Sequence, residues 1–208
     1  MFPLHFNIIK MPTWKPIVGL SFQTDGFRTY CQSLHWTSWR PSFIVLHNTG
    51  VPALADCPNG ITKNTIDGFV NYYRDEKHWS AGPHLFVDDH QIWVFTPLTT
   101  TGVHAPSWNA ISLGVEMLGN YDNDLFDSGR GQLVQQNAVA AIAILSGVLG
   151  LDPKTMKLHK EDPKTTHKDC PGRNVDKAKF INEVIAGVQA EHIGEHTFEL
   201  NLKNPQLS

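Results

Sequence analysis

The 208-residue sequence has few charged side chains and no long uninterrupted apolar run. Charged residues make up 18% of the chain and its formal net charge is -3, so nothing indicates a basic surface for nucleic acid or an anionic membrane. No stretch approaches the ~20 apolar residues that span a bilayer. The sequence therefore predicts a globular protein that neither binds nucleic acid nor inserts into a membrane.

The sequence also lacks the cysteines of a disulfide scaffold and the pattern of a signal peptide. Cys31, Cys57 and Cys170 are three in number, so they cannot all pair, and their spacing fits no disulfide framework. Residues 1–15 have no basic start, no long apolar run and no small-residue cleavage site. These features favour synthesis in the cytoplasm and a reducing compartment, or an oxidising one that leaves a thiol unpaired.

The order of apolar patterns predicts one α/β domain with a central sheet flanked by helices. Runs rich in strand formers alternate with helical patterns, and two of the runs, 84–87 and 91–95, predict a hairpin. The other expected strands are 43–47, 112–118 and 156–159, and the expected helices are 24–34, 62–76, 132–150 and 174–189. We place the catalytic domain at 42–190, an N-terminal extension with a short helix at 1–41, and a loosely held polar tail at 191–208.

Three chemically versatile side chains stand where these elements end. His47 closes the first expected strand, His159 closes the last one, and Cys170 lies in a proline-bounded turn. A lone histidine is more often a hydrogen-bonded structural residue than a ligand, so no single one decides the function. Together, two histidines and one cysteine leave an open fourth position on a tetrahedral zinc, which suits a catalytic site. Such a zinc lowers the pKa of its bound water to ~7 and serves amide hydrolysis.

Three segments make this idea specific: FIVLHNTG (43–50), GVHAPSWNAISLGVEMLGNY (102–121) and LHKEDPKTTHKDCPG (158–172). In this order they resemble the motif regions of the zinc-dependent N-acetylmuramoyl-L-alanine amidases. That superfamily includes phage amidase lysozymes, muropeptide-recycling amidases and peptidoglycan recognition proteins. The resemblance implies a mixed central sheet, a zinc cofactor, and hydrolysis of the amide between N-acetylmuramic acid and L-alanine in peptidoglycan or muropeptides.

Carried over position by position, the resemblance implies that His47, His159 and Cys170 bind zinc. Lys168 matches a lysine that family members aim at the scissile amide, where its ammonium stabilises the oxyanion. His167 is the rival ligand, because His167 and Cys170 also have a chelating spacing. The register that Lys168 sets assigns the ligand role to His159.

The general base differs between branches of the superfamily. The phage branch places a tyrosine directly before a histidine on the strand after the first helix, and here Pro83 occupies that position before His84. The recycling branch uses a glutamate on the later strand, which Glu116 supplies here. We therefore predict that Glu116 takes a proton from the attacking water and passes it to the leaving amine, the alternative being a structural role.

Four further residues are predicted to contact the substrate. His104 matches a family histidine near the substrate, and Asn109 and Trp108 belong to the same motif. His84 is the fourth, with the alternative that it orients a neighbour. Trp108 would stack on sugar or line the groove, or else cover the core.

Two other functions compete with the amidase. One is a non-catalytic peptidoglycan-binding module, although binders of this superfamily commonly lack the cysteine ligand. The other is a cysteine hydrolase with Cys170 as nucleophile and His159 or His167 as its base. For the amidase itself, the expected biological role is either an endolysin of a phage or prophage, or a cytosolic muropeptide-recycling enzyme.

Overall fold

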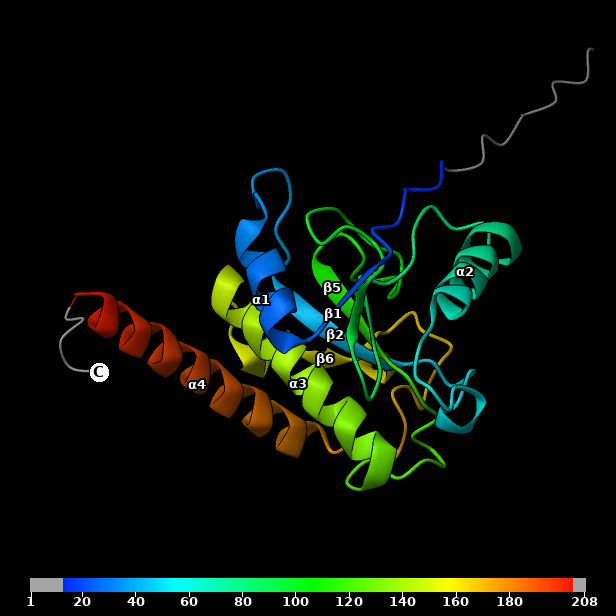
Figure 1. Cartoon of the computed structure of the whole chain (residues 1–208). Helices are drawn as coiled ribbons and strands as arrows, with labels where there is room; N and C mark the ends of the chain where they lie inside the picture. The colour runs from blue at the N-terminus through cyan, green and yellow to red at the C-terminus, as the bar shows by residue number, and fades with distance from the viewer. Residues whose placement is uncertain (1–12, 204–208) are drawn as a thin grey trace, which may run out of the picture.

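The computed structural model describes residues 13–203, with side chains described for residues 13–191. In this part of the chain a six-stranded sheet forms the centre and helices lie against it (Figure 1). The strands are β1 (Leu20–Phe22), β2 (Phe43–Asn48), β3 (Leu85–Val87), β4 (Ile92–Val94), β5 (Ser112–Met117) and β6 (Lys157–Leu158). The helices are α1 (Thr24–Ser33), α2 (Lys63–Asn71), α3 (Gly129–Leu149) and α4 (Lys177–Lys203), with the π-helical turn η2 (Tyr72–Glu76) and the 3-10 turns η1 (Leu54–Asp56), η3 (Pro153–Thr155) and η4 (His159–Glu161).

The sheet is mixed, with strand order β1-β4-β3-β5-β2-β6. β5 pairs in parallel with both β2 and β3, and β6 pairs in parallel with β2. β4 pairs antiparallel with β3, as the expected hairpin requires, and also with β1. The prediction of a single α/β domain with a mixed central sheet is confirmed.

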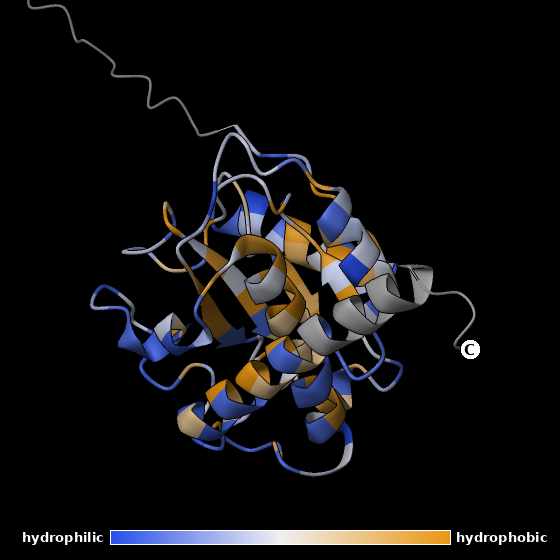
Figure 2. Ribbon diagram, turned by 90° about the vertical axis from the view of Figure 1, so that its left-hand side faces the viewer, coloured by the Kyte–Doolittle hydropathy of each residue, from blue (hydrophilic) through white to orange (hydrophobic). Residues whose placement is uncertain are grey.

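The two faces of the sheet carry different kinds of side chain and pack against different helices. Phe86, Glu116 and His47 lie side by side across β3, β5 and β2, and since strand side chains alternate they project to one face. α2 covers this face, where the ring of Phe69 stacks on Phe86 at 4.2 Å. The alternate residues at the middle of these strands, such as Leu46 and Val115, are apolar and face the α3 side, where Figure 2 shows apolar colour between helices and sheet. The functional face is therefore the one that the sheet shares with α2.

α3 is the core helix that the sequence predicted. Val134, Ala138, Ala141 and Leu145 are all buried along one stripe, and Gly150 ends the helix in the left-handed conformation with φ 66°. By length and composition alone α3 could cross a bilayer, contrary to our expectation that no stretch was long enough. Most of its window is buried within the protein, as in the core helix of a globular domain.

The N-terminal segment contributes to the sheet, which the sequence did not reveal. The expected helix is present as α1, and it buries Phe27 and Cys31 completely. The three-residue strand β1 precedes it and pairs with β4, Leu20 opposite Val94. A strand this short carries too little alternation to be recognised from sequence. The domain boundaries at 42 and 190 stay predictions.

α4 is longer than expected. The sequence predicted a helix over 174–189 followed by a loose tail, but α4 continues to Lys203 and extends away from the sheet (Figure 1). The polar residues after 189 include good helix formers, which continue a helix without an apolar stripe. The guanidinium of Arg28 on α1 holds Glu191 with two hydrogen bonds of 2.5 and 2.7 Å. The rest of the expected tail, residues 204–208, lies outside the described residues.

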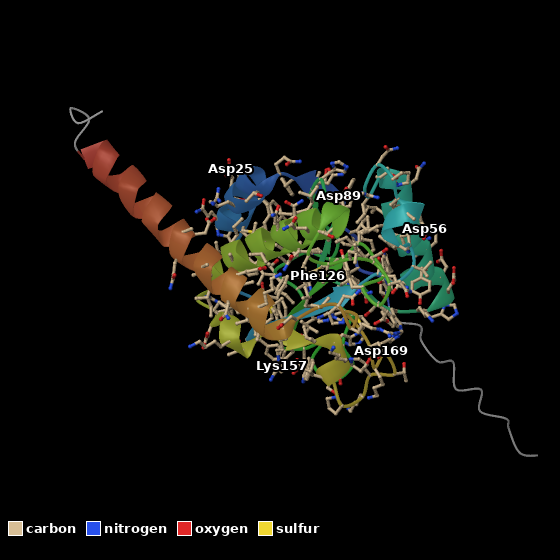
Figure 3. All side chains as sticks on the ribbon, turned by 90° about the horizontal axis from the view of Figure 1, so that it is seen from below. Asp25, Asp56, Asp89, Phe126, Lys157 and Asp169 are labelled. Atoms are coloured by element: carbon tan, nitrogen blue, oxygen red, sulfur yellow. The ribbon has the colours of Figure 1, made fainter. Side chains whose placement is uncertain are left out.

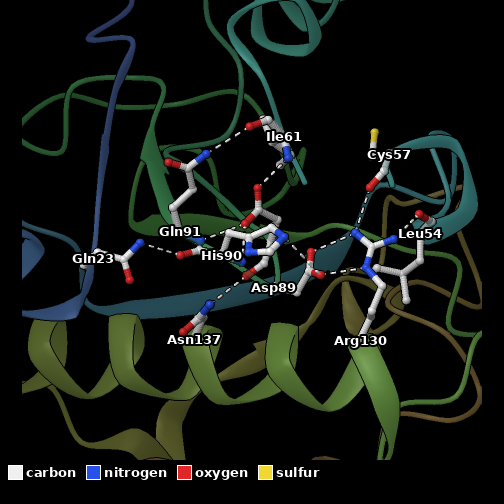
Figure 4. Close-up of polar contacts among 10 residues, drawn as sticks. Gln23, Leu54, Cys57, Ile61, Asp89, His90, Gln91, Arg130 and Asn137 are labelled. Carbon is white, nitrogen blue, oxygen red and sulfur yellow. Dashed lines mark hydrogen bonds and ion pairs between the residues drawn. The ribbon is translucent and has the colours of Figure 1, made fainter. Parts of the chain in front are cut away.

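Arg130, in the first turn of α3, fastens two loops to the helix (Figure 4). Its guanidinium pairs with the carboxylate of Asp89 at 2.6 and 2.8 Å. It also donates to the carbonyl oxygens of Leu54 and Cys57 at 2.6 and 2.7 Å. The β3–β4 turn and the loop after β2 are thus held together, and the start of that loop borders the site described below.

The segment between β5 and α3 supports the turn that carries Cys170. Tyr121 donates its hydroxyl to the carbonyl of Leu118. Phe126, which Figure 3 labels, packs on Tyr121 at 4.8 Å and on Phe180 of α4 at 6.2 Å. Gly172 has φ +117°, and a Cβ there would lie 2.4 Å from the Tyr121 backbone. Only glycine fits this close approach.

Candidate active site

A pocket of about 710 Å³ opens on the face of the sheet that α2 covers. Two sets of side chains line it, and the rest of its lining includes the loop that follows β2. We call the first set, which comes from β5 and two loops, the polar wall: His104, Glu116, His159, His167 and Cys170. We call the second set, which comes from α2, η2 and the residues just after it, the aromatic wall: Phe69, Tyr72, Tyr73 and Trp79.

His47, His159 and Cys170 form a possible metal site at the polar wall. Each offers one ligand atom, and these atoms all lie within 4.8 Å of one another. The parallel pairing of β6 with β2 brings His159 beside His47, with ring centroids 4.3 Å apart. The amide of Lys160 donates to the carbonyl of Cys170 at 2.8 Å, which draws the cysteine turn to the same place. These are the three residues that the sequence assigned to zinc.

His47 is oriented by a chain of hydrogen bonds behind the pocket. Nε2 of His104 lies 3.2 Å from the carbonyl oxygen of Ser112, which only accepts, so this nitrogen carries the proton. Nδ1 of the neutral His104 ring then accepts from Nε2 of His47 at 3.0 Å. The remaining nitrogen of His47, Nδ1, keeps its lone pair free. Such a partner on the far nitrogen is the usual way a metal-binding histidine is oriented.

His104 therefore acts behind His47, although it also lines the pocket. Its ring lies on the backbone of Gly114, where a Cβ would come within 2.5 Å of Cγ of His104. The glycine of the SLGVEML strand is needed for this contact. Sequence reasoning recognised the pattern without its cause, because the contact joins two segments only after folding. Whether His104 also touches substrate stays a prediction.

His159 is fixed in a similar way and His167 is not. The Thr165 hydroxyl bonds Nε2 of His159 at 2.9 Å, which leaves Nδ1 as the free nitrogen of that ring. Asp162 accepts the amide of Ser107 at 3.0 Å and so ties this loop to the one that carries His104. His167 is exposed, with its ring centroid 5.4 Å from that of His159, and it is not part of the three-ligand group. Sequence reasoning missed Thr165 and Asp162, which have no motif signal of their own.

The chemistry of this donor set fits zinc. Burial lowers the pKa of His47 well below its usual value and that of His159 to about 4, so both rings are neutral and can donate a lone pair. Burial raises the pKa of the Cys170 thiol, although the Asn48 amide that bonds to it acts in the opposite direction. Two neutral imidazoles and one thiol are typical zinc ligands, and a bound cation would favour the thiolate.

Glu116 lies next to this group. It is 9% exposed, and its Oε1 is 3.9 Å from Nδ1 of His47. Burial raises the pKa of Glu116 to about 8, and the carboxylate makes no hydrogen bond to any described residue. A buried carboxylate without a partner is costly, and such a group in a cleft is a candidate for proton transfer.

His84 and Asn109 hold the structure together. His84 is fully buried, and its Nδ1 accepts from the amide of Gly114 while its Nε2 donates to the carbonyl of Thr100, so neither nitrogen is left for a ligand. This matches the alternative that His84 orients its neighbours. Asn109 accepts the amides of His104 and Ala105, both at 2.8 Å, and thereby shapes the loop of His104.

Lys168 and Trp108 do not line the pocket. Lys168 is exposed on the loop between Thr165 and Cys170. Trp108 is half-buried and packs edge-on against Phe43 at 5.7 Å. Their contacts with substrate stay predictions.

The comparisons with known proteins agree with this geometry. The family model described as N-acetylmuramoyl-L-alanine amidase matches residues 38–173. Peptidoglycan-recognition protein SC2 of Drosophila melanogaster is 24% identical over 139 residues, which cover 64% of this chain and 70% of that protein.

Two solved structures have the same fold. The endolysin N-acetylmuramoyl-L-alanine amidase LysCS from Clostridium intestinale URNW is 23% identical, with a TM-score of 0.55 over 70% of this chain and 84% of that one. Drosophila PGRP-LB is 20% identical, with a TM-score of 0.53 over 68% and 80%. Because the family model spans most of the sequence and includes the whole three-ligand group, the chain belongs to the N-acetylmuramoyl-L-alanine amidase family.

Proposed function

We propose that this protein is a zinc-dependent amidase that hydrolyses the bond between N-acetylmuramic acid and L-alanine in peptidoglycan or its fragments. The observation that carries the proposal is the His47, His159 and Cys170 group within 4.8 Å, beside the buried carboxylate of Glu116. Family membership supports amidase chemistry, and the donor set supports zinc.

Each residue has a role in this reaction. His47, His159 and Cys170 would hold the zinc, which when bound supplies a Lewis acid and a water of lowered pKa. Glu116 takes a proton from the attacking water and gives it to the leaving amine of L-alanine. Its raised pKa suits a group that both accepts and donates a proton, and a nearby cation favours its ionised form. Lys168, from the loop beside the pocket, stabilises the oxyanion.

The pocket suits a substrate that is part sugar and part peptide. The aromatic wall offers ring faces on which sugar or apolar groups can stack. A single-residue mutant of Drosophila PGRP-LB has been solved in complex with tracheal cytotoxin. That complex supports a peptidoglycan-derived substrate for the pocket of this chain.

A binding module without catalysis is the second candidate function, since peptidoglycan-recognition proteins share the fold. The complete ligand group and the unpartnered Glu116 favour catalysis, because a binding groove needs neither. A cysteine hydrolase is disfavoured, because burial raises the pKa of Cys170 and a nucleophilic cysteine needs its thiolate.

Product analysis separates these functions. The amidase should release new L-alanine amino termini from purified peptidoglycan without new reducing sugar ends, and a chelator should stop it until zinc is restored. Wall binding without any product would favour the binding module. Activity that survives the chelator would favour the cysteine hydrolase.

The biological setting is a separate proposal, either an endolysin that degrades the wall or a recycling enzyme that acts on soluble muropeptides. The two differ in substrate size, so turnover of intact sacculi and of soluble muropeptides should be compared. An endolysin should act on both, whereas a recycling enzyme should act on the soluble fragments alone.

A further inference from the structure

Tyr73 has a hydroxyl that the fold does not use. The residue is 9% exposed, lies in the π-helical turn η2 and belongs to the aromatic wall. Its hydroxyl makes no hydrogen bond to any residue whose side chain the structure describes. π-helical turns are found frequently at functional sites. A hydroxyl without a partner on a side chain that lines a pocket is available to a ligand.

The ring of Tyr73 is held firmly in place. It stacks on Trp79 at 5.3 Å and meets Phe95 edge-on at 6.1 Å. A Cβ on Gly82 would lie 3.0 Å from Cδ2 of Tyr73, so the ring rests on the backbone just before Pro83. Pro83 itself has no side-chain donor. Tyr73, which comes from the turn after α2, therefore adds a hydroxyl to the part of the pocket lining where Pro83 offers no polar side chain.

Tyr73 also lies near Glu116, the carboxylate that the proposed reaction uses as its base. Glu116 lines the same pocket, and its charge adds to burial in raising the pKa of Tyr73 well above its usual value. The phenol therefore stays protonated at neutral pH and acts as a donor. It cannot serve as a base, which leaves that role to Glu116.

We propose that Tyr73 is a further catalytic residue, whose hydroxyl donates a hydrogen bond to the carbonyl oxygen of the scissile amide as negative charge develops on it. The inference rests on the proposed amidase function. No bond of Tyr73 is made or broken and its proton stays on the phenol, so the contribution is electrostatic. Loss of one such donor typically lowers kcat by about 10²-fold.

The test is Tyr73→Phe, which removes a single oxygen, beside Tyr30→Phe, which makes the same change on α1 away from the pocket. With a soluble N-acetylmuramoyl peptide, Tyr73→Phe should lose about 10²-fold in kcat. Its KM, zinc content and pH profile should stay those of the wild type, and Tyr30→Phe should keep full activity. Because the hydroxyl has no partner among the residues whose side chains are described, Tm should be unchanged or raised in Tyr73→Phe.

Two results would overturn the assignment. Wild-type kcat in Tyr73→Phe removes the catalytic role, and a loss of zinc or a lower Tm assigns Tyr73 a structural one. Failure of the amidase proposal itself looks different, because the wild type would then form no L-alanine termini at all.

Discussion

The two walls of the pocket are built in opposite ways. The polar wall gathers residues from segments far apart in the sequence, and hydrogen bonds to other buried groups fix the rings of His104 and His159. The aromatic wall comes from one stretch of about ten residues, and ring stacking such as that of Tyr73 on Trp79 fixes it. A hydrogen bond fixes the orientation of a side chain, whereas ring stacking provides a broad contact surface. We therefore expect the polar wall to determine the reaction and the aromatic wall to determine what the pocket accepts.

The largest expected effect is on the polar wall. Cys170→Ser replaces a zinc-binding thiol with a poor ligand and should abolish both stoichiometric zinc binding and amide hydrolysis. His167→Ala is the matched control from the same loop and should keep its zinc, because His167 is outside the three-ligand group. Metal analysis of the purified variants checks this. Zinc lost from His167→Ala and retained by His159→Ala would reverse the ligand assignment.

The next largest effect should come from Glu116, whose substitution tests proton transfer separately from zinc binding. Glu116→Gln keeps the shape of the side chain but removes the base, so kcat should fall by about 10²–10⁴-fold while zinc content stays at the wild-type value. Product release from a soluble muropeptide measures the rate. Full activity in Glu116→Gln would show that Glu116 is not the base and would favour a structural role for it.

Acid should destabilise the fold at the polar wall through two buried histidines, His104 in the wall and His84 next to it. Burial lowers the pKa of His84 to about 4 and that of His104 to about 3, below the unfolded value of about 6.5. The unfolded chain therefore binds protons first, so the stabilisation is complete above pH 6.5 and is lost as pH falls towards 4. For His84 alone the loss in the free energy of unfolding is about 3 kcal/mol.

Urea unfolding of the metal-free protein at pH 7 and pH 4 measures this loss. His84→Gln can still donate and accept a hydrogen bond but does not titrate, so its stability should depend less on pH. Equal pH dependence in the two proteins would show that His84 does not contribute.

The smallest effect belongs to the aromatic wall. Tyr72 is 39% exposed at this wall, so Tyr72→Ala removes stacking area without touching the metal group. A ring contact is worth about 1 kcal/mol, so KM should rise about five-fold at constant kcat and zinc content. A fall in kcat with KM unchanged would contradict the division of labour between the walls.

The sequence predicted the parts of the site that depend on local pattern. The apolar run 43–47 indicated a strand ending in His47, and the ordered motifs indicated His159 and Cys170, which the fold brings together. The spacing of apolar residues indicated α3 and its stripe. In each case the signal lies within a few neighbouring positions.

The remaining features depend on contacts between distant segments. Tyr73 lies within the helical pattern expected over 62–76 and has no motif signal, and only its packing against Gly82 and Phe95 shows that it lines the pocket. His104 was assigned to substrate, and its bond to His47 required the fold. The full length of α4 was missed because helix propensity continues where the apolar stripe stops.

The pairing of β1 with β4 predicts how residues 38–173, the segment that the family model matches, would behave if produced alone. The matched segment begins at residue 38, after β1 and α1. A fragment that starts there would leave the backbone groups of β4 that face β1 without their partners, although β4 would still pair with β3. An exposed strand edge is a template for joining another chain. Such a fragment should self-associate. In the full chain, residues 13–37 prevent this because β1 covers the edge of β4.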